Sequence, residues 1–121
     1  MRHCLIVDDS SVIRKVARRI LEDFEFSVSE AEDGRAALEA CQRSMPDMIL
    51  LDWHLPVMDG LEFLASLRQM DHGNQPKVVF CASEADVSQI ARALRAGADE
   101  YILKPFDRAA VEVKLHEVGM L

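Results

Sequence analysis

Residues 4–21 read CLIVDDSSVIRKVARRIL and contain one complete passage from a strand to a helix. The run from Cys4 to Val7 is continuously apolar, as is typical of a parallel strand covered on both faces. After the two acids Asp8 and Asp9, apolar residues recur at helical spacing, with basic residues on the opposite face. The predicted apolar stripe comprises Val12, Ile13, Val16, Ala17, Ile20 and Leu21. Ser10 or Ser11 is suited to cap the first turn.

The same passage from strand to helix recurs along the whole chain. Further apolar runs at residues 48–51, 78–81 and 101–103 predict buried strands, and the alternating residues 26–29 predict a strand at the edge of the sheet. Five strands and five helices in strict alternation indicate an α/β fold with a doubly wound, five-stranded parallel sheet. The predicted inward-facing residues of the later helices are Ala37, Leu38 and Cys41; Leu61, Leu64 and Leu67; Val87, Ile90, Ala91 and Leu94; and Val111, Leu115 and Val118.

Length and composition predict one globular domain over residues 1–121, half of whose residues are hydrophobic and 29% charged. The net charge of −7 argues against nucleic-acid binding, which needs a clustered basic surface. No apolar run approaches the length of a membrane span, and the N-terminus lacks a signal-peptide pattern, so we expect a cytoplasmic protein without a membrane partner. Cys4, Cys41 and Cys81 lie in apolar stretches without zinc-binding spacing, which indicates buried, reduced thiols.

Charged residues follow several of the predicted strands. Asp8 and Asp9 follow the first, Asp52 ends the third and Lys104 follows the fifth. Because functional sites of doubly wound sheets lie at the carboxyl ends of the strands, we expect these groups to converge. Each acid taken alone is compatible with a capping role, and Lys104 alone with a solvated loop. Two carboxylates about 4 Å apart repel by roughly 4 kcal/mol at an effective dielectric constant near 20. A convergence therefore calls for a cation, and carboxylate oxygens suit Mg²⁺.

Four ordered motifs then resemble a known family. They are VDDS at residues 7–10, LLDWHLPVMDG at 50–60, AGADEY at 96–101 and KPF at 104–106. Together they resemble the receiver domains of two-component response regulators, of the stand-alone CheY-like type. The resemblance covers essentially the whole chain. It implies a single receiver domain over residues 1–121 with the flavodoxin-like strand order 2-1-3-4-5.

The resemblance also implies a role for each residue that matches a motif. Asp52 is the expected phosphoacceptor and, with Lys104, catalytic. The expected ligands of Mg²⁺ are Asp8, Asp9, Asp52 and the backbone carbonyl of His54. The implied phosphodonor is a phosphohistidine on a sensor histidine kinase or a histidine phosphotransfer protein. Such a domain is not a conventional enzyme, since it catalyses its own phosphorylation and slow dephosphorylation. The resemblance also implies that the peptide bond between Lys104 and Pro105 is cis.

One position departs from the family pattern. The family usually has Thr or Ser at the end of the fourth strand, where counting back from Gly97 places Ala82 and counting forward from Pro76 places Cys81. Either Ser83 substitutes as the switch hydroxyl or the contact is absent. We expect phosphorylation to survive, with an altered coupling to the aromatic switch residue Tyr101.

The resemblance implies that a downstream protein target binds the face built from the fourth helix, fifth strand and fifth helix. His54 and Glu84 flank the expected path of the attacking water.

The principal alternative is a pseudo-receiver that acts as an interaction module without phosphorylation. A flavodoxin-like electron carrier is disfavoured by the acidic first loop, and a haloacid-dehalogenase-type phosphatase by His54, where a second carboxylate is required.

Overall fold

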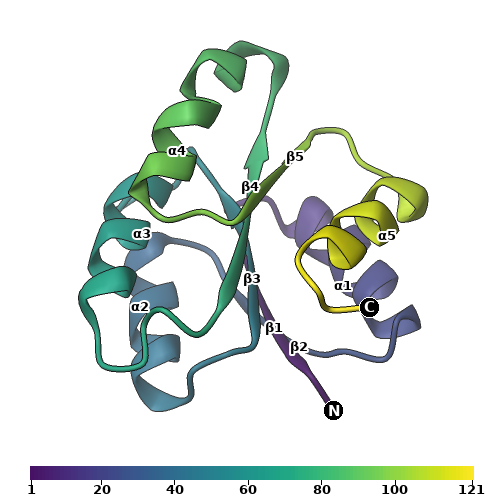
Figure 1. Ribbon diagram of the computed structural model, residues 1–121, viewed down its shortest axis with the longest axis horizontal. Coiled ribbons are helices and arrows are strands. Elements are labelled where there is room, and N and C mark those ends of the chain that lie inside the picture. Colours follow the sequence, from purple (N-terminus) through teal and green to yellow (C-terminus); the bar gives the residue numbers. More distant parts are fainter.

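A computed structural model describes residues 1–121 as one five-stranded sheet flanked by helices (Figure 1). The strands are β1 (His3–Val7), β2 (Ser27–Ala31), β3 (Met48–Asp52), β4 (Lys77–Ala82) and β5 (Glu100–Leu103). They pair in the order β2-β1-β3-β4-β5, and each of the four pairs is parallel. The predicted α/β class and strand order are thus confirmed.

Five α-helices and one 3₁₀ segment connect the strands. They are α1 (Ser11–Asp23), α2 (Gly34–Arg43), α3 (Gly60–Gln69), η1 (Glu84–Gln89), α4 (Ile90–Ala96) and α5 (Arg108–Glu117). The side chains of Ser10, Asp33, Asp59 and Asp107 each accept a hydrogen bond from a backbone N–H of the first helical turn. These caps set where α1, α2, α3 and α5 begin, because they satisfy donors that have no partner within the helix.

The helices form a layer on each face of the sheet. Figure 1 shows α2, α3 and α4 on one face and α1 and α5 on the other. Each face has its own apolar core, with 15 buried residues on the α2–α3–α4 side and 13 on the α1–α5 side. Successive strand residues such as Leu50 and Leu51 belong to opposite cores, which explains why the central strands are apolar without alternation.

The second strand was predicted too early in the chain. It runs from Ser27 to Ala31, whereas the pattern predicted residues 26–29. Phe26 precedes the strand and is buried in the α1–α5 core, so its apolar character reflects packing at the end of α1. The predicted position of this strand at the edge of the sheet is correct.

Two helices bury less of their apolar surface than predicted. In α1 only Ala17 and Leu21 are buried, while Val12 is 68% and Val16 48% exposed. The prediction for α4 was wrong in a similar way. Val87 lies in η1 and is 49% exposed, Leu94 is 40% exposed, Ala91 is exposed, Ile90 is half-buried, and Ala93 is the buried residue of α4.

Other expectations from the sequence hold. Val111 and Leu115 of α5 and Val118, which directly follows α5, are buried, and Gly97 follows α4 with a φ of +120°. The three cysteines are free and buried. Burial raises the pKa of all three thiols, that of Cys41 to about 11, so they stay protonated near neutral pH. No helix combines the length and apolar character that crossing a membrane requires.

Candidate functional site

Three charged side chains meet at the carboxyl edge of the sheet. Asp8 directly follows β1, Asp52 is the last residue of β3, and Lys104 directly follows β5. The Lys104 Nζ donates to Asp8 Oδ2 and to Asp52 Oδ1, each at 2.8 Å. The side chains are 4%, 11% and 19% exposed for Asp8, Asp52 and Lys104, so both ion pairs are largely shielded from water.

A third carboxylate completes an acidic group. Asp8, Asp9 and Asp52 each offer a ligand atom, and these atoms lie within 4.8 Å of one another. Asp9 is exposed, whereas the other two acids are buried. Asp8 also accepts from the backbone N–H of Ser10 at 2.9 Å, but Ser10 and not Asp8 caps the first turn of α1. Hard carboxylate oxygens at this spacing fit a divalent cation such as Mg²⁺.

Burial and opposite charges shift the pKa values at this edge. Burial raises the pKa of Asp52; the hydrogen bond from Lys104 opposes this effect and the charge of Asp8 adds to it. Burial alone would lower the pKa of Lys104, but its hydrogen bonds to Asp52 and Asp8 outweigh it, and the pKa is raised. Lys104 therefore stays charged as the fixed cation beside two acids.

The loop after β3 is held close to the sheet. The Trp53 ring packs edge-to-face on Phe80, with ring centroids 5.2 Å apart. Gly60 donates its N–H to the Trp53 carbonyl at 3.0 Å, and a Cβ at Gly60 would lie 2.2 Å from the Asp52 carbonyl oxygen. The motif therefore requires glycine here because the backbone of α3 approaches the backbone of Asp52 directly.

The end of β4 carries no hydroxyl. Ala82 is the last residue of this strand and is fully buried, and its carbonyl accepts from the Lys104 N–H at 2.9 Å. The Ser83 hydroxyl donates to Asp86 Oδ2 at 2.8 Å. Asp86 also accepts from the Nε2 of His54 at 2.9 Å, although the His54 side chain is 71% exposed.

Sequence reasoning missed Asp86, one of three buried acids in the molecule. A local signal was available, because Ser83 and Asp86 have the spacing of a capping box, in which each side chain bonds the other residue's backbone N–H. Nothing local predicted the contact with His54, which lies 32 residues earlier in the chain.

Tyr101, the expected aromatic switch, lies half-buried on β5. The Nζ of Lys114 lies 4.6 Å from its ring centroid and 3.4 Å from Glu100 Oε1. A cation over the ring and a neighbouring carboxylate thus link β5 to α5.

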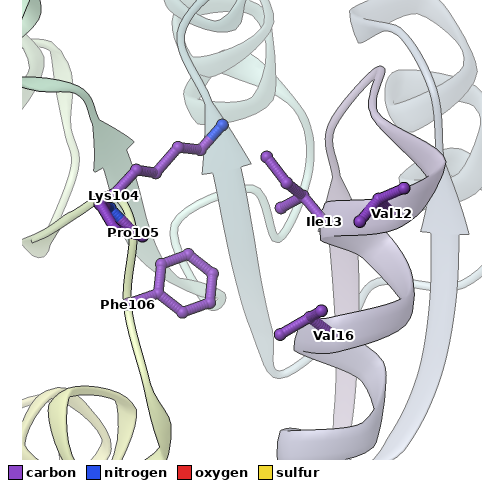
Figure 2. Close-up of a pocket in the computed structure, with 6 residues that line it drawn as sticks. All are labelled: Val12, Ile13, Val16, Lys104, Pro105 and Phe106. Atoms are coloured by element: carbon purple, nitrogen blue, oxygen red, sulfur yellow. The ribbon is translucent and has the colours of Figure 1, made fainter.

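An apolar groove adjoins the charged site. It has a volume of about 300 Å³ and is lined by Val12, Ile13, Val16, Lys104, Pro105 and Phe106. Figure 2 shows the Phe106 ring facing Ile13 and Val16 across the groove, with the Lys104 side chain extending past its upper end. The peptide bond between Lys104 and Pro105 is cis. The exposed valines of α1 thus form one wall of a groove that ends at the site.

This chain belongs to the response regulator receiver domain family, whose pattern it matches over residues 4–116. It is 35% identical over 118 residues to the chemotaxis protein CheY of Halobacterium salinarum, covering 97% of this chain and 96% of that protein. Within the family it is therefore a CheY-like receiver domain. Phosphorylation and use of Mg²⁺ are typical of the family, and an interaction module without phosphorylation is not favoured.

Solved structures agree with this assignment. The response regulator CheY4 of Vibrio cholerae superposes with a TM-score of 0.91 at 30% identity, covering 98% of both chains. The receiver domain of the sensor histidine kinase PA1611 from Pseudomonas aeruginosa superposes with a TM-score of 0.87 at 28% identity, again covering 98% of both. That structure holds a magnesium ion in its active-site cleft.

Proposed function

We propose that residues 1–121 act as a single receiver domain that accepts a phosphoryl group on Asp52 in a Mg²⁺-dependent reaction. The observation that carries this proposal is the Lys104 ammonium, 2.8 Å from both Asp8 and Asp52 at the edge of the sheet. Such a group neutralises charge on phosphoryl oxygens without moving during the reaction. The raised pKa of Lys104 keeps it protonated for this role.

The proposed transfer follows the family's chemistry. An Asp52 carboxylate oxygen forms a bond to phosphorus while the P–N bond of a phosphohistidine breaks, and the electron pair stays on the imidazole nitrogen. The product is an acyl phosphate on Asp52. Hydrolysis reverses the modification: a water oxygen bonds to phosphorus, the P–O bond to Asp52 breaks, and phosphate and a proton are released. The domain catalyses both steps on itself and is not a conventional enzyme.

Asp8, Asp9 and Asp52, with the backbone carbonyl of His54, are the proposed ligands of Mg²⁺. The three carboxylates lie close enough to share an ion, and exposed Asp9 offers its oxygen without losing a partner. The magnesium in the cleft of the PA1611 receiver domain supports the same use here. Bound Mg²⁺ supplies positive charge that Lys104 alone does not provide for three acids and a phosphoryl group.

The proposed phosphodonor is a sensor histidine kinase or a histidine phosphotransfer protein, and the groove suits its docking. Val12 and Val16 are exposed in the free domain, and they line a groove shared with Lys104. An apolar helix face seated there would bury both valines next to the site. We propose that the groove holds the donor while its phosphohistidine meets Asp52.

The proposed output is a change in binding of a downstream protein at the face formed by α4, β5 and α5, in the cytoplasm. Tyr101 is the proposed switch residue on this face, where Lys114 covers its ring. Ser83 is a proposed second switch residue, because its hydroxyl is the first that follows β4. A phosphoryl group adds charge and acceptor oxygens at the strand ends and biases such elements.

Intact-mass measurement tests the central claim. The protein is incubated with a small phosphoramidate, with Mg²⁺ or with a chelator. We expect the mass to increase by one phosphoryl group only with Mg²⁺, and not in Asp52→Asn. The matched control is Asp71→Asn, an exposed acid before β4, which should gain mass like the wild type. A gain in Asp52→Asn equal to that of the wild type would exclude Asp52 as the acceptor.

A further inference from the structure

Three side chains form what we call the polar bridge: His54, Asp86 and Ser83. The Nε2 of His54 lies 2.9 Å from Asp86 Oδ1. The other oxygen of Asp86 accepts from the Ser83 hydroxyl at 2.8 Å and from the Ser83 backbone N–H at 3.3 Å. Both carboxylate oxygens of Asp86 are therefore hydrogen-bonded. The residue is only 7% exposed, so these hydrogen bonds are largely shielded from water. Loss of one partner there leaves a buried acceptor less well satisfied.

The polar bridge joins two loops that leave neighbouring strands. His54 lies two residues after Asp52 in the loop between β3 and α3, and Asp86 lies in η1 after β4. The contact of His54 with Asp86 is the one hydrogen bond or ion pair between residues 53–59 and residues 83–96. Any polar connection between the Asp52 loop and the α4 segment therefore runs through this pair.

Other contacts that hold the α4 segment are few. In residues 83–96 only Asp86 and Ala93 are buried, while Val87 and Leu94 are 49% and 40% exposed. Ala82, at the end of β4, has no polar side chain to reach toward Asp52. A segment with few buried apolar contacts opens at low free energy, so a single hydrogen-bonded anchor has a large share in its position.

From these observations we infer that the polar bridge transmits the state of Asp52 to η1 and α4, in place of a hydroxyl at the end of β4. The inference rests on the proposed phosphorylation of Asp52. In the unmodified domain the bridge is closed and holds η1 against the loop of His54. A phosphoryl group on Asp52 adds negative charge two residues from His54 and displaces its loop. The imidazole then moves relative to Asp86, and the fraction of molecules in which His54 is hydrogen-bonded to Asp86 changes.

Hydrogen exchange of residues 83–96 measures this response directly. Exchange is followed by mass spectrometry in the wild type, with and without the small phosphodonor and Mg²⁺. We expect phosphorylation to change the exchange rates of this segment about fivefold or more, the lower end of typical coupling between two sites. In His54→Ala the change should fall below about twofold. This variant keeps the backbone carbonyl of residue 54 and the contacts between Ser83 and Asp86.

Asp86→Asn is the second variant, and it should also lose the response. The double variant should lose no more than either single variant, because the two residues act as one link. His72→Ala is the matched control, since His72 is an exposed histidine bonded to nearby Gln75, and it should keep the wild-type response.

Intact mass, recorded on every sample, separates the two proposals. If the variants gain the phosphoryl group and His54→Ala keeps the full exchange response, the polar bridge does not transmit the signal, although Asp52 is still the acceptor. If the wild type gains no phosphoryl group, the proposed function fails and this inference fails with it. A response that persists in Asp86→Asn but not in His54→Ala would also overturn the inference, because the link would then not include Asp86.

Discussion

Val57 has an unusual backbone conformation in the loop that follows the proposed phosphoacceptor. Its φ is +68°, and the residue is 77% exposed. A β-branched residue is strained in the left-handed region, and strain of this kind costs about 1–3 kcal/mol. Exposure of the side chain means that little packing offsets this cost. The strained backbone at Val57 therefore lowers the free energy of unfolding.

We therefore expect Val57→Asn to raise the free energy of unfolding by about 1 kcal/mol, because Asn tolerates positive φ well. Urea unfolding followed by Trp53 fluorescence measures this effect. Val87→Asn serves as the control, since Val87 is also exposed but does not have a positive φ. Equal effects of the two substitutions would show that polarity, and not backbone strain, is responsible.

Lys104 is the residue on which the charge balance of the site depends. In the absence of metal we expect Lys104→Met to lower the free energy of unfolding by about 3 kcal/mol, because it leaves Asp8 and Asp52 buried without a counter-charge. Urea unfolding in the presence of a chelator measures this loss. Adding Asp52→Asn should recover part of it by removing one of the two charges. A further loss in the double variant would contradict this account.

At the scale of elements, α1 and α4 show the same discrepancy between pattern and burial. Their apolar stripes were predicted correctly as helical, but Val16 of α1 and Leu94 of α4 remain exposed. A helical stripe shows which residues are able to face a neighbour, whereas the neighbours themselves decide how many are covered. On α1 the exposed Val12 and Val16 line the groove of Figure 2, and Phe106 faces Val16 across it.

If this groove holds a phosphodonor protein, Val16→Asp should slow phosphotransfer from the cognate donor about tenfold, the effect of losing roughly 1.4 kcal/mol of apolar contact. Phosphorylation by a small phosphoramidate should be unchanged, because that donor does not need the groove. Val113→Asp on α5 has similar exposure, 53% against 48%, and should leave both reactions unchanged. Equal slowing with both donors would indicate damage to the site itself and contradict docking in the groove.

At the scale of the whole molecule, the proposed metal site links ion binding to global stability. Asp52 meets Asp8 and Asp9 only in the folded chain, since it lies in a segment far from these two neighbouring acids in sequence. A ligand that binds only the folded state stabilises it by about 2.7 kcal/mol at one hundred times its dissociation constant. The net charge of −7 further favours cation binding.

We expect Mg²⁺ at one hundred times its dissociation constant to raise the free energy of unfolding of the wild type by about 2.7 kcal/mol, relative to NaCl at the same ionic strength. Asp9→Asn should abolish most of this increase while changing stability little in the absence of metal, because Asp9 is exposed. The control Asp71→Asn should keep the full increase. An increase of the same size in Asp9→Asn would show that the ion acts elsewhere.

The order of strands and helices, and the identity of the converging charged residues, could be predicted from the chain alone. Continuous apolar runs such as residues 48–51 show that a strand is buried on both faces, and such strands are parallel. Parallel strands end at one shared edge, so Asp8, Asp52 and Lys104 had to approach one another once the strands were recognised. These are consequences of local pattern and chain direction.

Packing between distant segments decided the remaining features. Phe26 looked like part of a strand but fills the core beside α1, and the apolar stripes of α1 and α4 are only partly covered. The contact of His54 with Asp86 joins residues 32 positions apart, and no periodicity encodes it. Sequence periodicity describes one element at a time, whereas burial and long-range hydrogen bonds depend on which other elements occupy the space beside it.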